Sequence, residues 1–157
     1  MPYSSLTIGV PRETYPSERR VSLTPSNAAL LLKRGFKRVL VESNAGLLSQ
    51  FTDKQYTDAG ATIVSSADAF SADIVMKVRP PRVESGEVTS LREGATLLSF
   101  LYPAQNSDLV KGLTAKKLNA FAMDLIPRIS RAQVFDALRC VCLNGIASAA
   151  QLNSMDI

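Results

Sequence analysis

Short apolar runs recur along the chain at intervals of about 20–30 residues, with polar, helix-like segments between them. The runs are rich in β-branched and aliphatic residues and are too short for buried helices, so they predict strands. They cover residues 6–11, 39–42, 62–64, 73–78, 96–101 and 119–123. Strands that alternate with helices in this way are typical of an α/β fold with an open, mostly parallel sheet and helices on both faces.

Capping signals mark the ends of the predicted helices. Thr24-Pro25 combines an N-cap residue with a proline at the first helical position, and Gly35 suits the position just after the same helix. Thr52 and three residues later a glutamine predict a capping box. Ser107 is the expected N-cap of the last helix before the sixth strand. Further helices are predicted over residues 52–60, 66–72 and 107–117, with a short one before residue 94.

The stretch from residue 122 to residue 138 organises the last predicted strand and helix. Its apolar start predicts the end of a strand, and Pro127 makes Ile126 extended, because a residue before proline avoids the helical region. Ser130 followed by Gln133 predicts a second capping box and hence a new helix. The result is a strand–loop–helix junction, the place where α/β proteins tend to hold their ligand contacts.

Three polar residues of this junction are the candidate site. Arg128 lies in the loop, and Gln133 and Asp136 are three residues apart, so they share one helix face near its amino end. The residue types alone are also compatible with a purely structural role for these residues. Gln133 would then only close the capping box, and Asp136 would only favour the positive end of the helix dipole.

Composition excludes several classes of function. The 157 residues are 46% hydrophobic and 20% charged, typical of a folded domain. The net charge is +4, but the basic residues are scattered and only six Phe and four Tyr offer aromatic stacking, so we expect no nucleic-acid binding. No apolar run reaches the roughly 18–20 residues of a membrane helix, and no targeting peptide is visible. We therefore expect a soluble chain without a membrane span.

The absence of histidine removes the commonest general base and the commonest metal ligand. Cys140 and Cys142 are too close together for a disulfide framework, and no second pair completes a zinc site. We predict no metal site and no catalytic acid, base or nucleophile.

Lys77 is the one charged residue inside a predicted buried strand, residues 73–78. A charge there is costly unless it has a partner or lies at the carboxyl end of the strand, where α/β sheets bind ligands. A lysine that extends from the strand end to solvent is an equally good interpretation. Lys77 is therefore a second candidate site residue.

Three stretches form a linked set. The first is Gly9-Val10-Pro11-Arg12-Glu13, followed by Glu18, Arg20-Val21, Thr24-Pro25, Lys33 and Gly35, and the second is Lys77-Val78-Arg79-Pro80-Pro81. The third comprises residues 98–106 and 123–138. The first two resemble the N-terminal blocks shared by alanine dehydrogenases and nicotinamide nucleotide transhydrogenases, and the third resembles the transhydrogenases specifically. The resemblance covers about residues 4–138, and it implies a Rossmann-like, flavodoxin-like subdomain.

The resemblance implies a function. Proton-translocating transhydrogenases pass hydride between NAD(H) and NADP(H), and this chain resembles the first of two subdomains of their NAD(H)-binding component. In that component the residues that match Arg128, Gln133 and Asp136 face the nicotinamide of NAD. The implied partners are NAD(H), the NADP(H)-binding and membrane components, and a second copy in a homodimer. The implied location is the mitochondrial matrix or bacterial cytoplasm side of the membrane.

The chain departs from the family pattern at two places. Ser17 stands where the first block has asparagine, and Arg139 stands where the family has a serine after Leu138. We expect residues 1–138 to form the family domain and residues 139–157 a divergent tail. No G-x-G-x-x-G follows a strand, so the pyrophosphate-binding subdomain is expected to be missing. We therefore expect this chain to be an incomplete NAD(H)-binding component with weak or no activity.

Three alternatives remain from the sequence. The first is a non-catalytic module that pairs with intact subunits. The second is an alanine dehydrogenase-like enzyme, in which Arg20 and Lys77 match the residues that bind the keto acid. The family's histidine is replaced there by Tyr102, which disfavours this reading. The third is a chain that aggregates through uncovered apolar surface.

Overall fold

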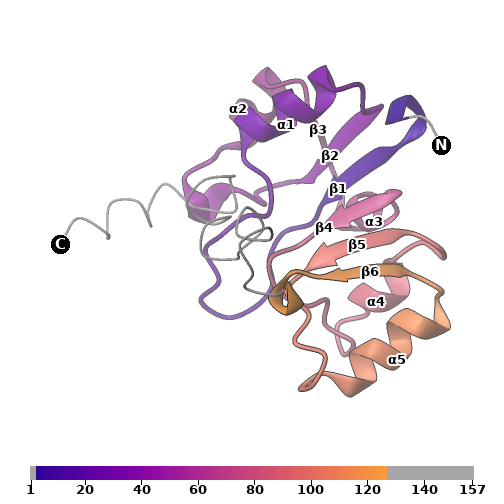
Figure 1. The fold of residues 1–157 in the computed structure, drawn as a ribbon. Helices are drawn as coiled ribbons and strands as arrows, with labels where there is room; N and C mark the ends of the chain where they lie inside the picture. The colour runs from indigo at the N-terminus through magenta and orange to yellow at the C-terminus, as the bar shows by residue number, and fades with distance from the viewer. Residues whose placement is uncertain (1–2, 127–157) are drawn as a thin grey trace.

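Six parallel strands form the centre of the protein, which the computed structural model describes over residues 3–126. They are β1 (Thr7–Val10), β2 (Arg38–Glu42), β3 (Thr62–Val64), β4 (Ile74–Met76), β5 (Thr96–Ser99) and β6 (Asn119–Ala122). The order across the sheet is β3-β2-β1-β4-β5-β6, and every pairing is parallel (Figure 1). This is the order of Rossmann folds rather than the flavodoxin order, and it confirms the predicted open α/β class.

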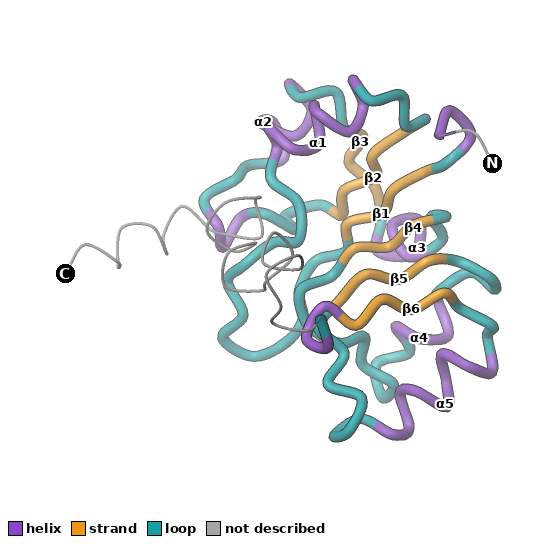
Figure 2. The backbone as a smooth tube through the Cα atoms, in the orientation of Figure 1, coloured by secondary structure: helices purple, strands orange, loops and turns teal. Residues whose placement is uncertain are grey.

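Helices cover the sheet in two groups. Within residues 3–126 they are α1 (Pro25–Lys33), α2 (Asp53–Asp58), α3 (Ser66–Phe70), α4 (Glu87–Ser90) and α5 (Ser107–Ala115), with 3-10 turns η1 (Tyr3–Ser5), η2 (Leu47–Ser49) and η3 (Met123–Leu125). The first two helices contact each other, and α3, α4 and α5 form a second series of contacts on the other face (Figure 2). None of these helices has the length and apolar character needed to cross a membrane.

Most of the predicted caps are present. The Thr24 side chain accepts from the Asn27 amide, and the capping box of Thr52 and Gln55 has both of its hydrogen bonds. Gly35 follows α1 with φ of +97°, a conformation that glycine adopts without steric cost. These local signals therefore set the helix ends as the sequence predicted.

Most predicted elements are a few residues longer than the observed ones, and two of the boundaries that differ are informative. The N-cap of α5 is Asn106, not Ser107, and its side chain does not cap the helix. The Asn106 amide donates instead to the carbonyls of Leu101 and Tyr102, at 2.9 and 3.1 Å, because the preceding turn brings both within reach. The last strand ends at Ala122, and the apolar residues after it form the turn η3 rather than more strand.

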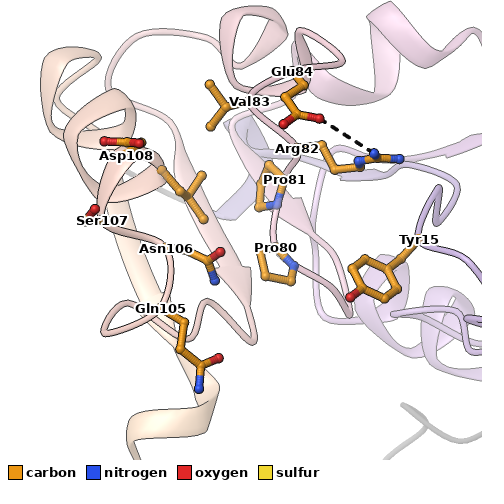
Figure 3. Close-up of a pocket in the computed structure, with 11 residues that line it drawn as sticks. Tyr15, Pro80, Pro81, Arg82, Val83, Glu84, Gln105, Asn106, Ser107 and Asp108 are labelled. Atoms are coloured by element: carbon orange, nitrogen blue, oxygen red, sulfur yellow. Dashed lines mark ion pairs between the residues drawn. The ribbon is translucent and has the colours of Figure 1, made fainter.

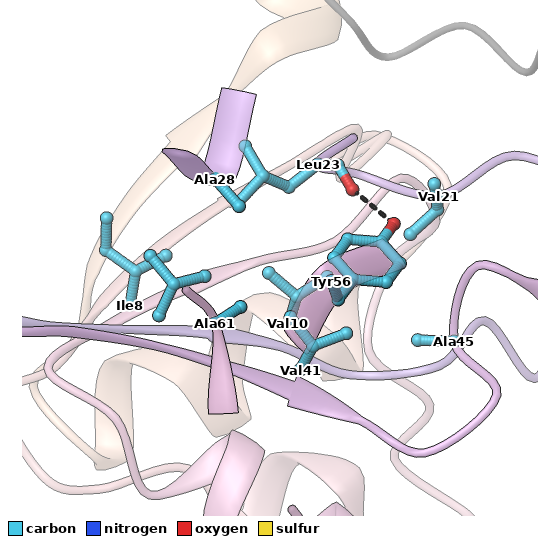
Figure 4. Close-up of a cluster of buried hydrophobic side chains, with 10 residues drawn as sticks. Ile8, Val10, Val21, Leu23, Ala28, Val41, Ala45, Tyr56 and Ala61 are labelled. Carbon is cyan, nitrogen blue, oxygen red and sulfur yellow. Dashed lines mark hydrogen bonds between the residues drawn. The ribbon is translucent and has the colours of Figure 1, made fainter. Parts of the chain in front are cut away.

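Each face of the sheet has its own apolar core. Alternate residues of one strand point to opposite faces, so Val39 and Val41 enter the cluster under α1 and α2 while Leu40 enters the cluster under α3 to α5. Tyr56 of α2 is fully buried in the first cluster, and its hydroxyl donates to the Leu23 carbonyl at 2.7 Å (Figure 4). Burial raises the pKa of this hydroxyl, so it stays a neutral donor.

Gly9 of β1 allows α3 to approach the sheet. A Cβ atom at this position would lie 1.9 Å from the Ala69 carbonyl oxygen and 2.9 Å from the Ala72 Cβ. Backbone cannot move aside as a flexible side chain can. The close contact of helix and strand therefore depends on the absence of a side chain at residue 9.

Gly9→Ala is expected to lower the free energy of unfolding by about 2–3 kcal/mol, because either α3 or β1 must move. Urea unfolding followed by circular dichroism measures the change. The matched control is Gly112→Ala in α5, where the new methyl group meets only the Val88 side chain at 3.2 Å. The control should change stability by less than about 1 kcal/mol, because alanine also favours the helix. Equal effects of the two changes would contradict the close-approach argument.

Candidate functional site

The strand order reverses between β1 and β4, and the loops that leave their carboxyl ends meet there. Glu13 lies in the loop after β1, and Lys77 follows directly after β4. Lys77 is only 4% exposed. Its Nζ lies 3.5 Å from Glu13 Oε2 and 3.3 Å from Glu87 Oε2. Lys77 is therefore a buried, paired charge at the carboxyl end of β4, and the solvent-directed interpretation is wrong.

Glu13 is held by backbone donors as well as by the lysine. Its Oε1 accepts from the Val78 amide at 2.6 Å and its Oε2 from the Arg79 amide at 3.3 Å. Burial raises the pKa of the Glu13 carboxyl, and the charge of Lys77 and the two amides oppose this effect. Glu13 therefore joins the loop after β1 to the loop after β4.

Glu87, at the start of α4, completes the surroundings of Lys77. It accepts from the Thr14 hydroxyl at 2.7 Å and from the Arg82 amide at 3.1 Å. The Lys77 ammonium also lies 5.7 Å from the centre of the Phe70 ring. A buried ammonium with two carboxylates and one aromatic face has its desolvation cost compensated locally.

Glu18 forms the second half of the charged group. It binds the Arg20 guanidinium through two parallel hydrogen bonds of 2.7 and 2.6 Å, and it accepts from Arg79 Nε at 2.8 Å. The Arg79 guanidinium lies 4.9 Å from the ring centre of Tyr15. Burial alone would raise the pKa of Glu18, but the hydrogen bonds and charges of the two arginines outweigh it and lower the pKa to about 2.

We call these six residues the ionic cluster: Glu13, Glu18, Arg20, Lys77, Arg79 and Glu87. Three carboxylates balance three cations, and each cation has a carboxylate within 3.5 Å. Among the described residues no buried side-chain polar atom lacks a hydrogen-bond partner. An anionic ligand would have to displace one of the protein's own carboxylates, which leaves a buried charge unpaired. The cluster therefore braces the loops instead of offering an open anion site.

The pyrophosphate of a dinucleotide does not fit this end of the sheet in residues 3–126. Pro11 follows β1, where a dinucleotide-binding turn has glycines, and it offers no backbone donor. The amides of Val78, Arg79 and Arg82, which could have cradled a phosphate, are already bound by Glu13 and Glu87. Over the same residues no group of three potential metal ligands is found.

The predicted site residues Arg128, Gln133 and Asp136 lie outside the described residues. The chain that leads to them is described up to Ile126. Asp124, in η3, accepts from the amide of Leu101 at 2.6 Å and from that of Tyr102 at 3.1 Å. Ile126 is extended, with φ of −64° and ψ of 120°, as the following proline predicts.

Sequence reasoning missed two carboxylates, Glu87 and Asp124. Asp124 interrupts the apolar run 122–126, and that interruption was the available signal. Glu87 has no comparable signal, because an acidic residue in the first turn of a helix is expected for the helix dipole alone.

A pocket of about 410 Å³ lies beside the ionic cluster. Pro80 and Pro81 form its middle, Tyr15 lies on one side and Asn106 on the other (Figure 3). The pocket therefore joins the loops after β1, β4 and β5 at the carboxyl end of the sheet.

The backbone at Ser17 explains why the family pattern has asparagine at this position. Its φ is +63°, a left-handed conformation that asparagine adopts more readily than serine. Ser17→Asn should therefore raise the free energy of unfolding by about 0.5 kcal/mol. Thermal melting measures this gain, and Ser85→Asn serves as an exposed control. A melting temperature that falls would contradict this account of position 17.

Glu18→Gln tests the ionic cluster through pH. The pKa of Glu18 is lower in the folded protein than its usual 4.5, so the ionised group stabilises the fold above that pH. The variant should lose about 2 kcal/mol at pH 7. The difference from the parent should shrink as the pH falls from about 4.5 towards 2. Glu84→Gln, which removes an exposed pair with a 4.0 Å separation, should change little at any pH.

Comparison with known proteins agrees with this geometry. The chain is 48% identical over 133 residues to the NAD(P) transhydrogenase subunit alpha of Haemophilus influenzae, covering 85% of this chain and 25% of that protein. It is 38% identical to the alanine dehydrogenase of Staphylococcus saprophyticus, with 77% of this chain and 32% of that protein covered. The solved structure of the Sinorhizobium meliloti transhydrogenase superposes with a TM-score of 0.78 at 36% identity, covering 84% and 39% of the two chains.

The family assignment follows from a match over most of the chain. The chain spans about a quarter to a third of the length of the curated relatives above. The family profile described as alanine dehydrogenase/PNT, N-terminal domain, matches residues 9–143. With its six-stranded Rossmann-like sheet, the chain belongs to the alanine dehydrogenase/PNT N-terminal domain family.

Proposed function

We propose that this chain forms the first part of the NAD(H)-binding component of a proton-translocating transhydrogenase, an enzyme that passes hydride between NAD(H) and NADP(H). The observation that carries the proposal is the 48% identity to an NAD(P) transhydrogenase subunit alpha. The resemblance of residues 123–138 to the transhydrogenases supports it, and the described start of that stretch, residues 123–126, follows the carboxyl end of β6.

Arg128, Gln133 and Asp136 are the proposed contacts to the nicotinamide. The Gln133 amide pairs with the carboxamide and orients the ring, and Arg128 and Asp136 hold the loop in place. Hydride transfer depends on the positioning of the two rings more than on an acid or base. A chain without histidine is compatible with this chemistry.

The affinity of this chain for NAD(H) should be low. Residues 3–126 offer no place for the pyrophosphate, so the contacts are confined to the nicotinamide half. Loss of the pyrophosphate contacts should weaken binding by about a thousandfold, equal to about 4 kcal/mol. We propose that residues 1–138 are the functional domain and residues 139–157 a divergent tail, and that catalysis requires further components.

The proposed partners are the NADP(H)-binding and membrane components and a second copy of the chain. The complex would place this chain on the mitochondrial matrix or bacterial cytoplasm side of the membrane. A non-catalytic module that pairs with intact subunits would use the same surfaces without binding nucleotide.

An alanine dehydrogenase-like activity fits the ionic cluster less well. Arg20 and Lys77 match the cations that bind a keto acid in that branch. Here Arg20 is paired with Glu18, and Lys77 is paired with Glu13 and Glu87. Tyr102 occupies the position of the catalytic histidine. Pyruvate should therefore leave the melting temperature of the chain unchanged.

The test of the proposed function is a titration of the purified chain with NADH, followed by nucleotide fluorescence. We expect weak, saturable binding that Gln133→Ala reduces by about tenfold. Lys54→Ala, at an exposed position of α2 outside the pocket beside the ionic cluster, is the control and should bind as the parent does. A cooperatively melting parent without NADH affinity would contradict the proposal and favour the interaction module.

A further inference from the structure

The turn after β5 has an unusual backbone that is held from two sides. Tyr102 has φ of +46°, in the left-handed region that residues other than glycine rarely adopt. The Asn106 side chain donates to the carbonyls of Leu101 and Tyr102. The Asp124 carboxylate accepts from the amides of the same two residues. The carbonyls of Leu101 and Tyr102 are thus bound by a side chain of the same loop, and their amides by a carboxylate more than 20 residues further along the chain.

The turn is connected onward to the ionic cluster. The Ser99 hydroxyl donates to the Arg79 carbonyl at 2.9 Å, and the Phe100 amide donates to the Val78 carbonyl at 3.2 Å. Arg79 also binds Glu18 of the ionic cluster. A set of hydrogen bonds, joined through the chain segment 99–102, therefore connects the switch point between β1 and β4 to Asp124.

Asp124 is the last residue of this set before the proposed nicotinamide loop. It lies four residues before Arg128, and one residue, Leu125, separates it from the extended Ile126. Because each of its carboxylate oxygens binds one of two successive amides, both the position and the direction of the chain at Asp124 are constrained. Leu125 and Ile126 follow this anchored residue in the described part of the chain.

We propose that Asp124 is a positioning residue for the nicotinamide loop. It anchors the start of the loop to the Leu101–Tyr102 turn, and through that turn to the ionic cluster. The inference rests on the proposed function, in that the loop carrying Arg128, Gln133 and Asp136 is the one that contacts the cofactor. Asp124 itself acts through the loop and not on the nucleotide.

Asp124→Asn removes the charge and one of the two acceptor oxygens. We expect NADH affinity to fall about tenfold, because the loop loses its fixed start. Asp124→Glu keeps the charge and should recover part of the affinity. Asp53→Asn is the matched control. The Asp53 carboxylate is half-buried like that of Asp124. It accepts from the Asn44 amide and the Ser43 hydroxyl, both at 2.8 Å, in the loop after β2.

Limited trypsin digestion supplies a readout that does not need the cofactor. Cleavage after Arg128 and Arg131 should be about threefold faster or more in Asp124→Asn than in the parent, while Asp53→Asn should cleave there at the parent rate. Rates are compared at equal distance below each melting temperature, so that a general loss of stability is not read as loop release.

The outcomes are distinguishable. A parent that binds NADH, with Asp124→Asn and Asp53→Asn affected equally, would overturn the positioning role and leave the proposed function intact. A parent that does not bind NADH would overturn the proposed function, and the trypsin rates alone would then decide the positioning role. Faster cleavage only in Asp124→Asn would support that role, and equal cleavage in all variants would overturn it.

Discussion

The pairing of Lys77 with Glu13 and Glu87 is the interaction on which the carboxyl end of the sheet depends. A lysine directly after a buried strand carries a charge that apolar packing cannot solvate. The chain supplies one carboxylate from the loop after β1 and one from the start of α4. Each carboxylate then uses its remaining capacity on backbone amides. One buried ammonium thereby joins the loop after β1 to the end of β4 and the start of α4.

The same constraint explains how the Rossmann-like strand order is used here. In this topology the crevice between β1 and β4 is the expected place for a ligand. The protein fills this crevice with its own ion pairs. The three cations of the ionic cluster are therefore balanced by its three carboxylates, without a bound anion. The neighbouring loops after β1, β4 and β5 surround a pocket beside the filled crevice. The pocket formed by Tyr15, Pro80 and Asn106 lies among these loops.

The fold was largely predictable because it follows from local signals. The short apolar runs predicted all six strands, and Thr24, Thr52 and Gly35 marked helix ends through interactions within a few residues. The site was less predictable because its contacts are long-range. Glu13 and Val78 are 65 residues apart, and no pattern near either residue predicts their hydrogen bond. The family resemblance picked out Glu13, Glu18 and Lys77 without indicating that they are joined. The pairing of Glu13 with Lys77, and of Glu18 with Arg20 and Arg79, became visible only in three dimensions.

The balance of the ionic cluster has a consequence for the field around the protein. Three positive and three negative charges in close pairs produce a potential that falls steeply with distance, so the cluster adds little to long-range attraction. The net charge of +4 therefore comes from residues outside the cluster. They include four exposed basic residues between the end of α1 and the start of β2, namely Lys33, Arg34, Lys37 and Arg38. An anion near those four side chains, at the amino end of β2, would be attracted to them. Its attraction should weaken with added salt, whereas the buried pairs remain nearly unscreened.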